Sequence, residues 1–148
     1  MRTIKFRGKI LELNLGCKMN VGDWVYGDLH LLSKIPHIHT INNKYIINTE
    51  TIGQYTGLQD KNDVEIYEGD IVRVSCVPVK YIGTNAISYI VDCICVFFQG
   101  SFLYKRISPF DKQKLSRNWT YKPMNRLDIK EVEVIGNIHD NPELLKGE

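Results

Sequence analysis

Apolar and polar residues alternate with a period of two along most of this chain, and this period restricts the fold to one built mainly from β-strands. Such alternation places one side of a strand in a core and the other side in solvent. The pattern predicts strands over residues 4–9, 24–32, 35–40, 44–48, 71–77, 87–98, 102–106 and 131–138. Many short strands separated by turn residues are typical of an all-β sandwich or barrel, and this is the fold class that we predict.

Three details of these strands can also be predicted. The first strand directs three basic side chains to its outer face, at Lys5, Arg7 and Lys9. Gly27 indicates a bulge or a close approach of another backbone. Asn42-Asn43 separates two strands of a hairpin, and asparagine tolerates the positive φ of a tight turn.

Signals for helices are scarce. Ser108 followed by Pro109 is typical of a helix start, so residues 111–117 are predicted to form one short helix. Asn141-Pro142 repeats the pattern and predicts a single turn near the C-terminus.

The length of 148 residues fits one domain, here 1–148. A break near residues 49–60 would divide it into β subdomains of about 1–52 and 53–148, although no flexible linker marks the boundary. The N-terminus lacks the apolar core of a signal peptide, and the longest apolar run, 93–98, is too short to span a bilayer. We therefore expect a soluble protein that does not associate with membranes.

Cysteine usage agrees with this expectation. Four cysteines are few for a chain of this size, and a core of this length needs no disulfide. Cys93 and Cys95 lie two positions apart in a predicted strand, so they share a face and are expected to be small buried apolar residues. Reduced thiols indicate a cytoplasmic location.

One long block carries a family resemblance. Residues 54–72 read Gln-Tyr-Thr-Gly-Leu-Gln-Asp-Lys-Asn-Asp-Val-Glu-Ile-Tyr-Glu-Gly-Asp-Ile-Val, and shorter matching blocks lie at 4–9, 24–27, 134–138 and 141–145. Together they resemble the YopX family of phage and prophage proteins over nearly the whole chain. The resemblance implies a β-rich fold, an origin in a phage or prophage, and a location in the cytoplasm of the bacterial host. It implies no catalytic residues and no cofactor, because the family has no established enzymatic activity.

The composition of this block indicates turns that determine the fold. Residues 60–63, Asp-Lys-Asn-Asp, can bond their own backbone, and residues 68–70 form a second turn before the strand at 71. Asp63 departs from the family, which often has glycine there, so turn geometry at this position carries some cost. Four side chains of the block are expected to anchor it in the core, namely Tyr55, Leu58, Ile66 and Tyr67.

Metal and catalytic sites find little support in the sequence. The acids Asp60, Asp63, Glu65, Glu68 and Asp70 do not follow the spacing of a calcium loop, and a magnesium site assembled from two of them is a weak alternative.

Two histidines, His37 and His39, share one face of a strand that Pro36 places at a sheet edge, but no further zinc ligands accompany them. No motif for a nucleophile or a phosphate loop is present. We therefore predict no catalytic residues, no cofactor and no metal, and keep an unrecognised metal-dependent hydrolase as an alternative.

The segment 105–130 carries eight basic residues and two acidic ones, with three aromatic residues between them. Basic side chains of this kind would follow a phosphate backbone, and aromatic rings would stack on unpaired bases. A nucleic-acid role would assign phosphates to Lys112, Lys114, Arg117, Lys122 and Arg126, and a base to Trp119. The alternative is a solvated basic loop whose aromatic residues anchor it to the core.

The strand at residues 87–98 is apolar on both faces except at Asp92, so both faces need cover. A subunit partner could supply the second layer, or the strand could be central in one sandwich or barrel. We favour a non-enzymatic accessory protein of a phage or prophage that binds a protein partner and could form a homo-oligomer. Nucleic-acid binding through residues 105–130 is the alternative.

Overall fold

The structure is a computed structural model that describes residues 3–12, 18–32, 34–77, 89–107, 120–125 and 129–146. Strands make up most of the described residues, and the helical ones form two short 3-10 segments, η1 (Thr49–Thr51) and η3 (Pro142–Lys146). The predicted all-β class is therefore confirmed. Two compact units divide the chain, Met1–Gly57 and Leu58–Glu148. No helix within the described ranges is long and apolar enough to cross a membrane.

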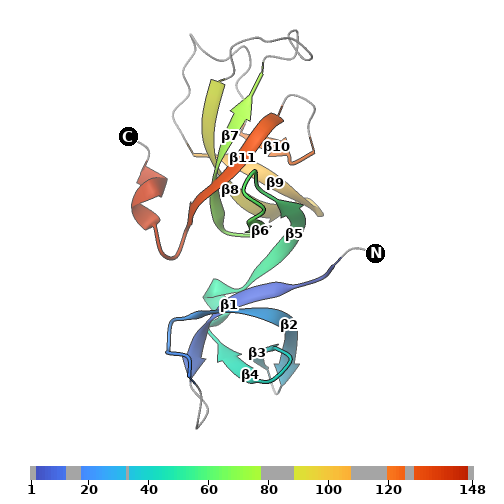
Figure 1. Cartoon of the computed structure of the whole chain (residues 1–148), viewed down its shortest axis with the longest axis vertical. Helices are drawn as coiled ribbons and strands as arrows, with labels where there is room; N and C mark the ends of the chain where they lie inside the picture. The colour runs from blue at the N-terminus through green and yellow to red at the C-terminus, as the bar shows by residue number, and fades with distance from the viewer. Residues whose placement is uncertain are drawn as a thin grey trace. The chain divides into compact units, whose positions relative to one another are not determined.

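Four strands of the N-terminal unit close into a small barrel (Figure 1). They are β1 (Phe6–Glu12), β2 (Trp24–Leu32), β3 (Ile35–His39) and β4 (Lys44–Ile47). Each strand pairs antiparallel with the next, and β4 pairs back with β1. Because β3 lies between β2 and β4, the prediction that His37 and His39 lie on an edge strand is wrong.

The barrel interior is filled by alternate residues of its strands. The buried cluster consists of Ile10, Val25, Ile38, Tyr45 and Ile47. A side-chain carbon added to Gly27 would collide with the backbone carbonyl oxygen of His39, which confirms the predicted close approach at this glycine. β2 and β3 are paired neighbours, and at Gly27 the backbone of one lies directly against that of the other.

After η1, strand β5 (Gly53–Gln59) pairs with β1 and with the short strand β6 (Glu65–Tyr67). The C-terminal unit then builds a five-stranded antiparallel sheet in the order β10-β9-β8-β7-β11. Its strands are β7 (Asp70–Cys76), β8 (Tyr89–Phe98), β9 (Ser101–Arg106), β10 (Tyr121–Pro123) and β11 (Ile129–Asn137). The sequence pattern missed β5, β6 and β10.

One face of this sheet forms the core of the C-terminal unit. Its buried members are Ile66, Val72, Val74, Cys76, Val91, Cys93, Cys95 and Tyr104. Cys93 and Cys95 are buried free thiols on one face, as predicted.

The opposite face of β8 is less covered, since Ile90 and Phe98 are exposed. The prediction that a subunit partner supplies a second layer over this face stays a prediction. Asp92 lies on this open face, where Arg73 binds it through two contacts of 2.9 and 3.2 Å.

The turns follow the sequence in part. The hairpin of β3 and β4 is confirmed, but its turn does not use a positive φ at Asn42 or Asn43. Instead, the Thr40 hydroxyl and the Asn43 backbone bond each other across it. Positive φ occurs at Gln99 and Gly100, where β8 turns into β9. The predicted terminal turn is present as η3, whereas the helix predicted at 111–117 lies outside the described residues.

Candidate functional site

The turn at residues 60–63 binds the edge of the C-terminal sheet. The Asp60 carboxylate accepts hydrogen bonds from three backbone amides, those of Asn62 at 2.7 Å, Val64 at 3.0 Å and Val134 at 2.9 Å. The amide of Lys61 donates to the carbonyl of Val132 at 2.9 Å. Val132 and Val134 belong to β11, so the turn occupies backbone groups on the side of this strand that does not face β7.

Electrostatics agree with a structural role for Asp60. Burial acts to raise the pKa of its carboxyl, but the amides of Val134, Asn62 and Val64 outweigh burial and leave the pKa below its ordinary value. The carboxylate is thus ionised and saturated with backbone donors at neutral pH. This arrangement supports the interpretation of the block as a determinant of the fold.

The other members of the block have similar uses. Asp70 is buried and accepts from the Tyr67 amide at 2.7 Å, and the Tyr67 hydroxyl donates to Glu65 at 2.6 Å. Ile66 and Tyr67 are core residues as predicted, whereas Leu58 is exposed, so its prediction as a core anchor is wrong. Within the described ranges, no three His, Cys, Asp or Glu side chains come together as a metal site.

Three histidines lie together on the outer wall of the barrel. His30 and His39 stack with ring centroids 4.1 Å apart, and His37 meets His39 edge-on at 6.5 Å. The Nδ1 of His37 donates to the Ile35 carbonyl at 2.9 Å. Burial lowers the pKa of His39, and the nearby charges of His30, Lys44 and His37 lower it further, against an opposing effect of Asp28. Parallel stacking directs the nitrogens of His30 and His39 past each other, which does not favour a shared metal ion.

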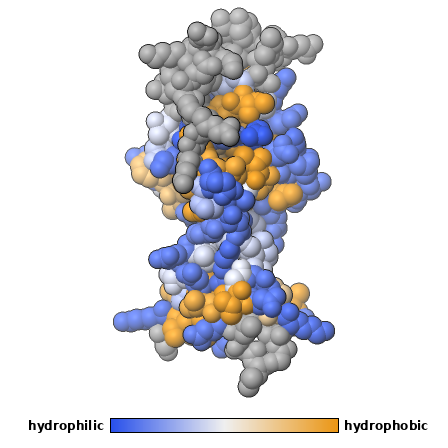
Figure 2. Space-filling model, turned by 90° about the vertical axis from the view of Figure 1, so that its left-hand side faces the viewer, coloured by the Kyte–Doolittle hydropathy of each residue, from blue (hydrophilic) through white to orange (hydrophobic). Residues whose placement is uncertain are grey.

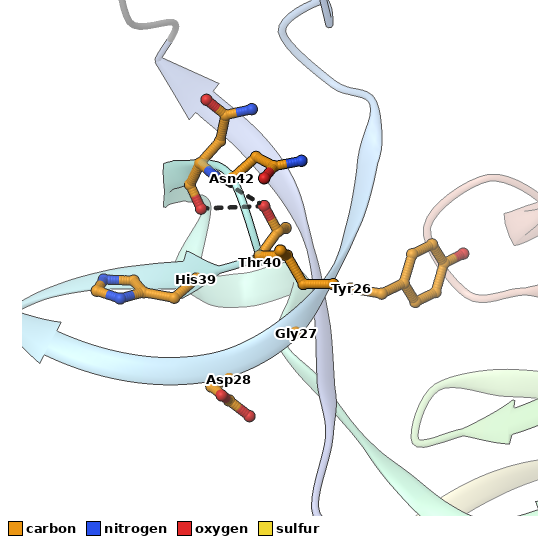
Figure 3. Close-up of a pocket in the computed structure, with 8 residues that line it drawn as sticks. Tyr26, Gly27, Asp28, His39, Thr40 and Asn42 are labelled. Atoms are coloured by element: carbon orange, nitrogen blue, oxygen red, sulfur yellow. Dashed lines mark hydrogen bonds between the residues drawn. The ribbon is translucent and has the colours of Figure 1, made fainter.

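A shallow pocket of about 500 Å³ adjoins this cluster, lined by Tyr26, Gly27, Asp28, His39 and residues 40–43. The Thr40 hydroxyl in this lining is bonded to the Asn43 backbone at 3.1 Å. Figure 3 shows the side chains of Tyr26 and His39 extending away from each other. The Thr40 hydroxyl is thus engaged by the turn of its own hairpin and not by His39 or Asp28.

The thiols of the C-terminal core are also unsuited to nucleophilic chemistry. Burial, with smaller contributions from Cys76 and Asp92, raises the pKa of Cys93 far above its ordinary value. A thiol in this state stays protonated at neutral pH, and the thiolate is the reactive form.

The residues predicted to bind nucleic acid are described only in part. Lys122 lies in β10, is 6% exposed, and donates from its Nζ to the Sγ of Cys76 at 3.6 Å. Its ammonium thus faces the core of its unit. The remaining five, Lys112, Lys114, Arg117, Trp119 and Arg126, lie outside the described residues, so their role stays a prediction.

A second group of cations and rings lies on the outer wall of the barrel, and we name it the cation–aromatic row. Its five members are Lys5, Arg7, Lys9, Trp24 and Tyr26. The Arg7 guanidinium lies 4.7 Å from the centre of the Trp24 ring, the Lys9 ammonium 5.4 Å from the same ring, and the Lys5 ammonium 5.7 Å from Tyr26. The sequence predicted the basic face of β1, but the pairing of β1 with β2 that brings the rings to it required the structure.

Exposed aromatic side chains gather where β8 turns into β9, and we name this group the aromatic hairpin tip. It consists of two ring pairs, Phe97 with Phe102 at 5.1 Å and Phe98 with Tyr121 at 4.9 Å. Phe97 is 52% exposed and Phe98 42%. On the face shown in Figure 2, apolar side chains reach the surface in separate patches among hydrophilic ones.

Comparison with known proteins identifies the family. The family model described as YopX protein matches residues 24–146 of this chain. The chain belongs to the YopX family. Among the curated proteins, none matches it. The crystal structure of protein EF1440 from Enterococcus faecalis is similar at 24% identity and a TM-score of 0.47, over 98% of this chain and 99% of that one.

Within this YopX chain, the matched range includes the block 54–72, whose acids bind backbone amides and a tyrosine hydroxyl. The cations of β1 lie before the range, and the aromatic hairpin tip lies inside it. Membership in the YopX family indicates a small protein whose biochemical function is not known.

Proposed function

We propose that this YopX protein is a non-enzymatic accessory protein of a phage or prophage, acting in the bacterial cytoplasm as a binding module for a protein partner. The observation that carries this proposal is the aromatic hairpin tip. Phe97 and Phe98 follow each other on β8 and point to opposite faces of the hairpin, so rings cover both sides of its end. We assign the tip to an apolar groove on the partner.

The energetics of interfaces support this assignment. A few buried aromatic residues usually supply most of the binding free energy of a protein interface. The rings of the tip already pack in pairs, one stacked and one edge-on, so they would lose little side-chain entropy on binding. Exposure of two adjacent phenylalanines is otherwise unfavourable in water by roughly 25 cal/mol per Å² of apolar surface.

The absence of an assembled catalytic group among the described residues supports the binding role over the metal-dependent hydrolase. Asp60 and Asp70 bind backbone amides, His37 binds a backbone carbonyl, and Cys93 has a raised pKa. Each of these side chains would have to give up a structural partner or its burial to act in catalysis.

The test is site-specific photo-crosslinking in bacterial cells that express the full chain. A crosslinking phenylalanine analogue replaces Phe97 in one variant and Val64 in another, since Val64 is also an exposed apolar residue of the same unit. We expect a discrete crosslinked protein from position 97 and none from position 64. The double variant F97S/F98S of unlabelled protein should fail to compete for it, whereas L58S/V64S should compete as well as the natural sequence.

Sedimentation of the purified chain separates the two kinds of partner. A dimer that forms with rising concentration and is lost in F97S/F98S would identify a second copy as the partner. A monomer that still gives the crosslink at position 97 would identify a different protein. A monomer with no crosslink specific to position 97 would overturn the proposal.

A further inference from the structure

We propose that the cation–aromatic row on the barrel is a binding site for single-stranded nucleic acid. This inference does not depend on the aromatic hairpin tip, which belongs to the other unit, or on the basic residues at 105–130. It starts from β1 and the residue before it, where Lys5, Arg7 and Lys9 alternate with inward residues such as Ile10. Alternate residues of a strand lie about 6.7 Å apart, so the outer wall presents cations at a regular spacing comparable with that of successive phosphates along one strand.

The register of β1 and β2 places aromatic rings beside these cations. Arg7 is the pairing partner of Tyr26, and Lys9 is the partner of Trp24. Both pairs therefore project from the same outer face, and the three cation–π contacts hold the basic groups over the rings. Phosphates and bases alternate along a nucleic-acid strand in the same way, with charge on one side and planar rings on the other.

The members of the row differ in exposure, and this difference divides their roles. Arg7 is only 6% exposed and lies 4.7 Å from the Trp24 ring, so we assign it to positioning that ring. Lys5 and Lys9 are half-buried, with their stems against the rings, and are assigned to phosphates. Tyr26 is 45% exposed, and its ring is assigned to stacking on a base.

A third strand extends the wall on the other side of β1. Arg7 pairs with Gly53 of β5, and the amide of Tyr55 donates to the carbonyl of Lys5 at 2.8 Å. Tyr55 therefore lies beside Lys5 on the same face and adds a third ring. On β2, Asp28 follows Tyr26 on this face and is the one acid among residues 24–28 there. The charge of the wall is thus mainly positive, and it complements a polyanion.

Single strands fit this wall better than a duplex does. Stacking on Tyr26 requires an unpaired base whose face is accessible, and a duplex buries these faces in its own stack. The lysines are assigned to phosphates and the Tyr26 ring to stacking, so we expect binding with little sequence preference. DNA and RNA share the phosphate and base chemistry that the wall would contact, and the experiment distinguishes them.

The experiment is fluorescence anisotropy of the full chain with a labelled oligodeoxythymidine, the corresponding oligouridine and a DNA duplex, over a range of salt concentrations. The variant K5E/K9E should weaken single-strand binding by about tenfold or more at low salt. Loss of two phosphate contacts should also reduce the slope of log affinity against log salt by about 1.4, at about 0.7 for each contact with a single strand. The variant Y26A should weaken binding without this change in slope.

A matched control tests whether position matters beyond net charge. The variant K18E/K44E makes the same change in net charge at two exposed lysines of the same unit. We expect it to lower affinity by less than about twofold. Circular dichroism should show an unchanged fold for Y26A, because Tyr26 is exposed. If K5E/K9E unfolds, the affinity of Y26A still tests whether the cation–aromatic row binds single strands.

Several results would overturn the proposal. One is no binding to any of the three probes at low salt, and another is tighter binding to the duplex than to single strands. Equal losses in K5E/K9E and K18E/K44E would show general attraction without a site. Loss of binding in K114E/R117E alone would assign the activity to the segment 105–130 instead. The variant F97S/F98S should keep full single-strand affinity. The nucleic-acid proposal and the protein-partner proposal can therefore fail independently of each other.

Discussion

The two units deal differently with the exposed backbone of short antiparallel strands. In the N-terminal unit, β1 to β4 pair in a ring, so each strand finds a neighbour on both sides. In the C-terminal unit, the sheet ends at β11, and the turn at residues 60–63 binds backbone groups on its outer side. An unprotected strand edge would otherwise pair with other chains.

Each solution imposes its own local requirement. The pairing of β2 with β3 in the barrel brings the backbone at Gly27 against the carbonyl of His39, where no larger residue fits. Protection of β11 needs a buried carboxylate at Asp60 and a positive φ of 63° at Asp63. The barrel thus depends on close packing at glycines such as Gly27, and the edge of the sheet depends on the Asp60 carboxylate. Four experiments test this difference, from the largest expected effect to the smallest.

Replacement of Asp60 by alanine should have the largest effect. It leaves the amides of Asn62, Val64 and Val134 without the carboxylate that they share, at a cost of about 3 kcal/mol in the free energy of unfolding. A loss of this size should lower the melting temperature by about 10 °C. Hydrogen exchange should speed up at Val134 and leave the amide of Ile38 in the barrel unchanged. Equal loss in both units would contradict the comparison.

Gly27→Ala should destabilise the barrel by about 2 kcal/mol, because the added carbon meets a backbone atom that cannot move aside. The expected signature is the reverse of the previous one, with faster exchange at Ile38 and no change at Val134. Leu31→Ala, at an exposed position of the same strand, provides the control and should alter the melting temperature little. An unchanged barrel in G27A would show that closure tolerates a larger residue.

Asp63→Gly should stabilise the C-terminal unit by about 0.5–1 kcal/mol, since glycine adopts a positive φ without the steric cost borne by other residues. Thermal melts of the natural chain and the variant measure this difference. Asn62→Gly, one position earlier and without a positive φ, should destabilise or leave the unit unchanged. A lower melting temperature for D63G would indicate that the Asp63 side chain contributes more than its backbone geometry costs.

The smallest expected effect is a difference between the two units in how their stability depends on pH. The folded pKa of His39 lies below the ordinary 6.5, so the unfolded chain binds more protons as the pH falls below 6.5. The barrel should therefore lose stability from that pH downward until the lowered folded pKa is passed. Asp60 also has a lowered pKa, and its contribution is present above 3.8 and lost as the pH falls through the folded value.

Hydrogen exchange at pH 7.5 and pH 5.5, corrected for the intrinsic pH dependence of exchange, would isolate the His39 window, because the Asp60 window lies below pH 3.8. We expect faster opening of the barrel at the lower pH and little change in the C-terminal sheet. His39→Gln should remove most of the change in the barrel. A similar loss in both units would show that other groups dominate the titration.

Much of this architecture could be predicted from the period of two, because strands such as β2 and β8 are long enough to show it. Strands β6 and β10 have three residues each, and so short a segment carries no period. β5 contains two glycines, which indicate turns when read locally. The turn residues at 60–63 were recognisable, but the bond from Asp60 to Val134 depends on a distant strand that no local pattern reveals.

The candidate surfaces show the same limit. The basic face of β1 follows directly from alternation, yet Trp24 lies beside Lys9 only because β2 pairs with β1 in one particular register. Lys122 reads as one of several basic residues in the sequence, whereas the structure turns its ammonium toward Cys76. The stacking of Phe98 on Tyr121 joins β8 and β10 across a segment whose path the sequence does not specify.

The bond between Asp60 and Val134 spans 74 positions of the chain. A ribosome delivers the chain from its N-terminus, so the barrel strands, which end at Ile47, are available early, while the sheet waits for β11. A product that stops before Val134 would contain a finished barrel followed by a sheet with an open edge at β7 and an Asp60 that lacks its β11 donor. Cellular proteases should degrade such truncated products from the C-terminal side. The expected product is a fragment of about the size of the barrel.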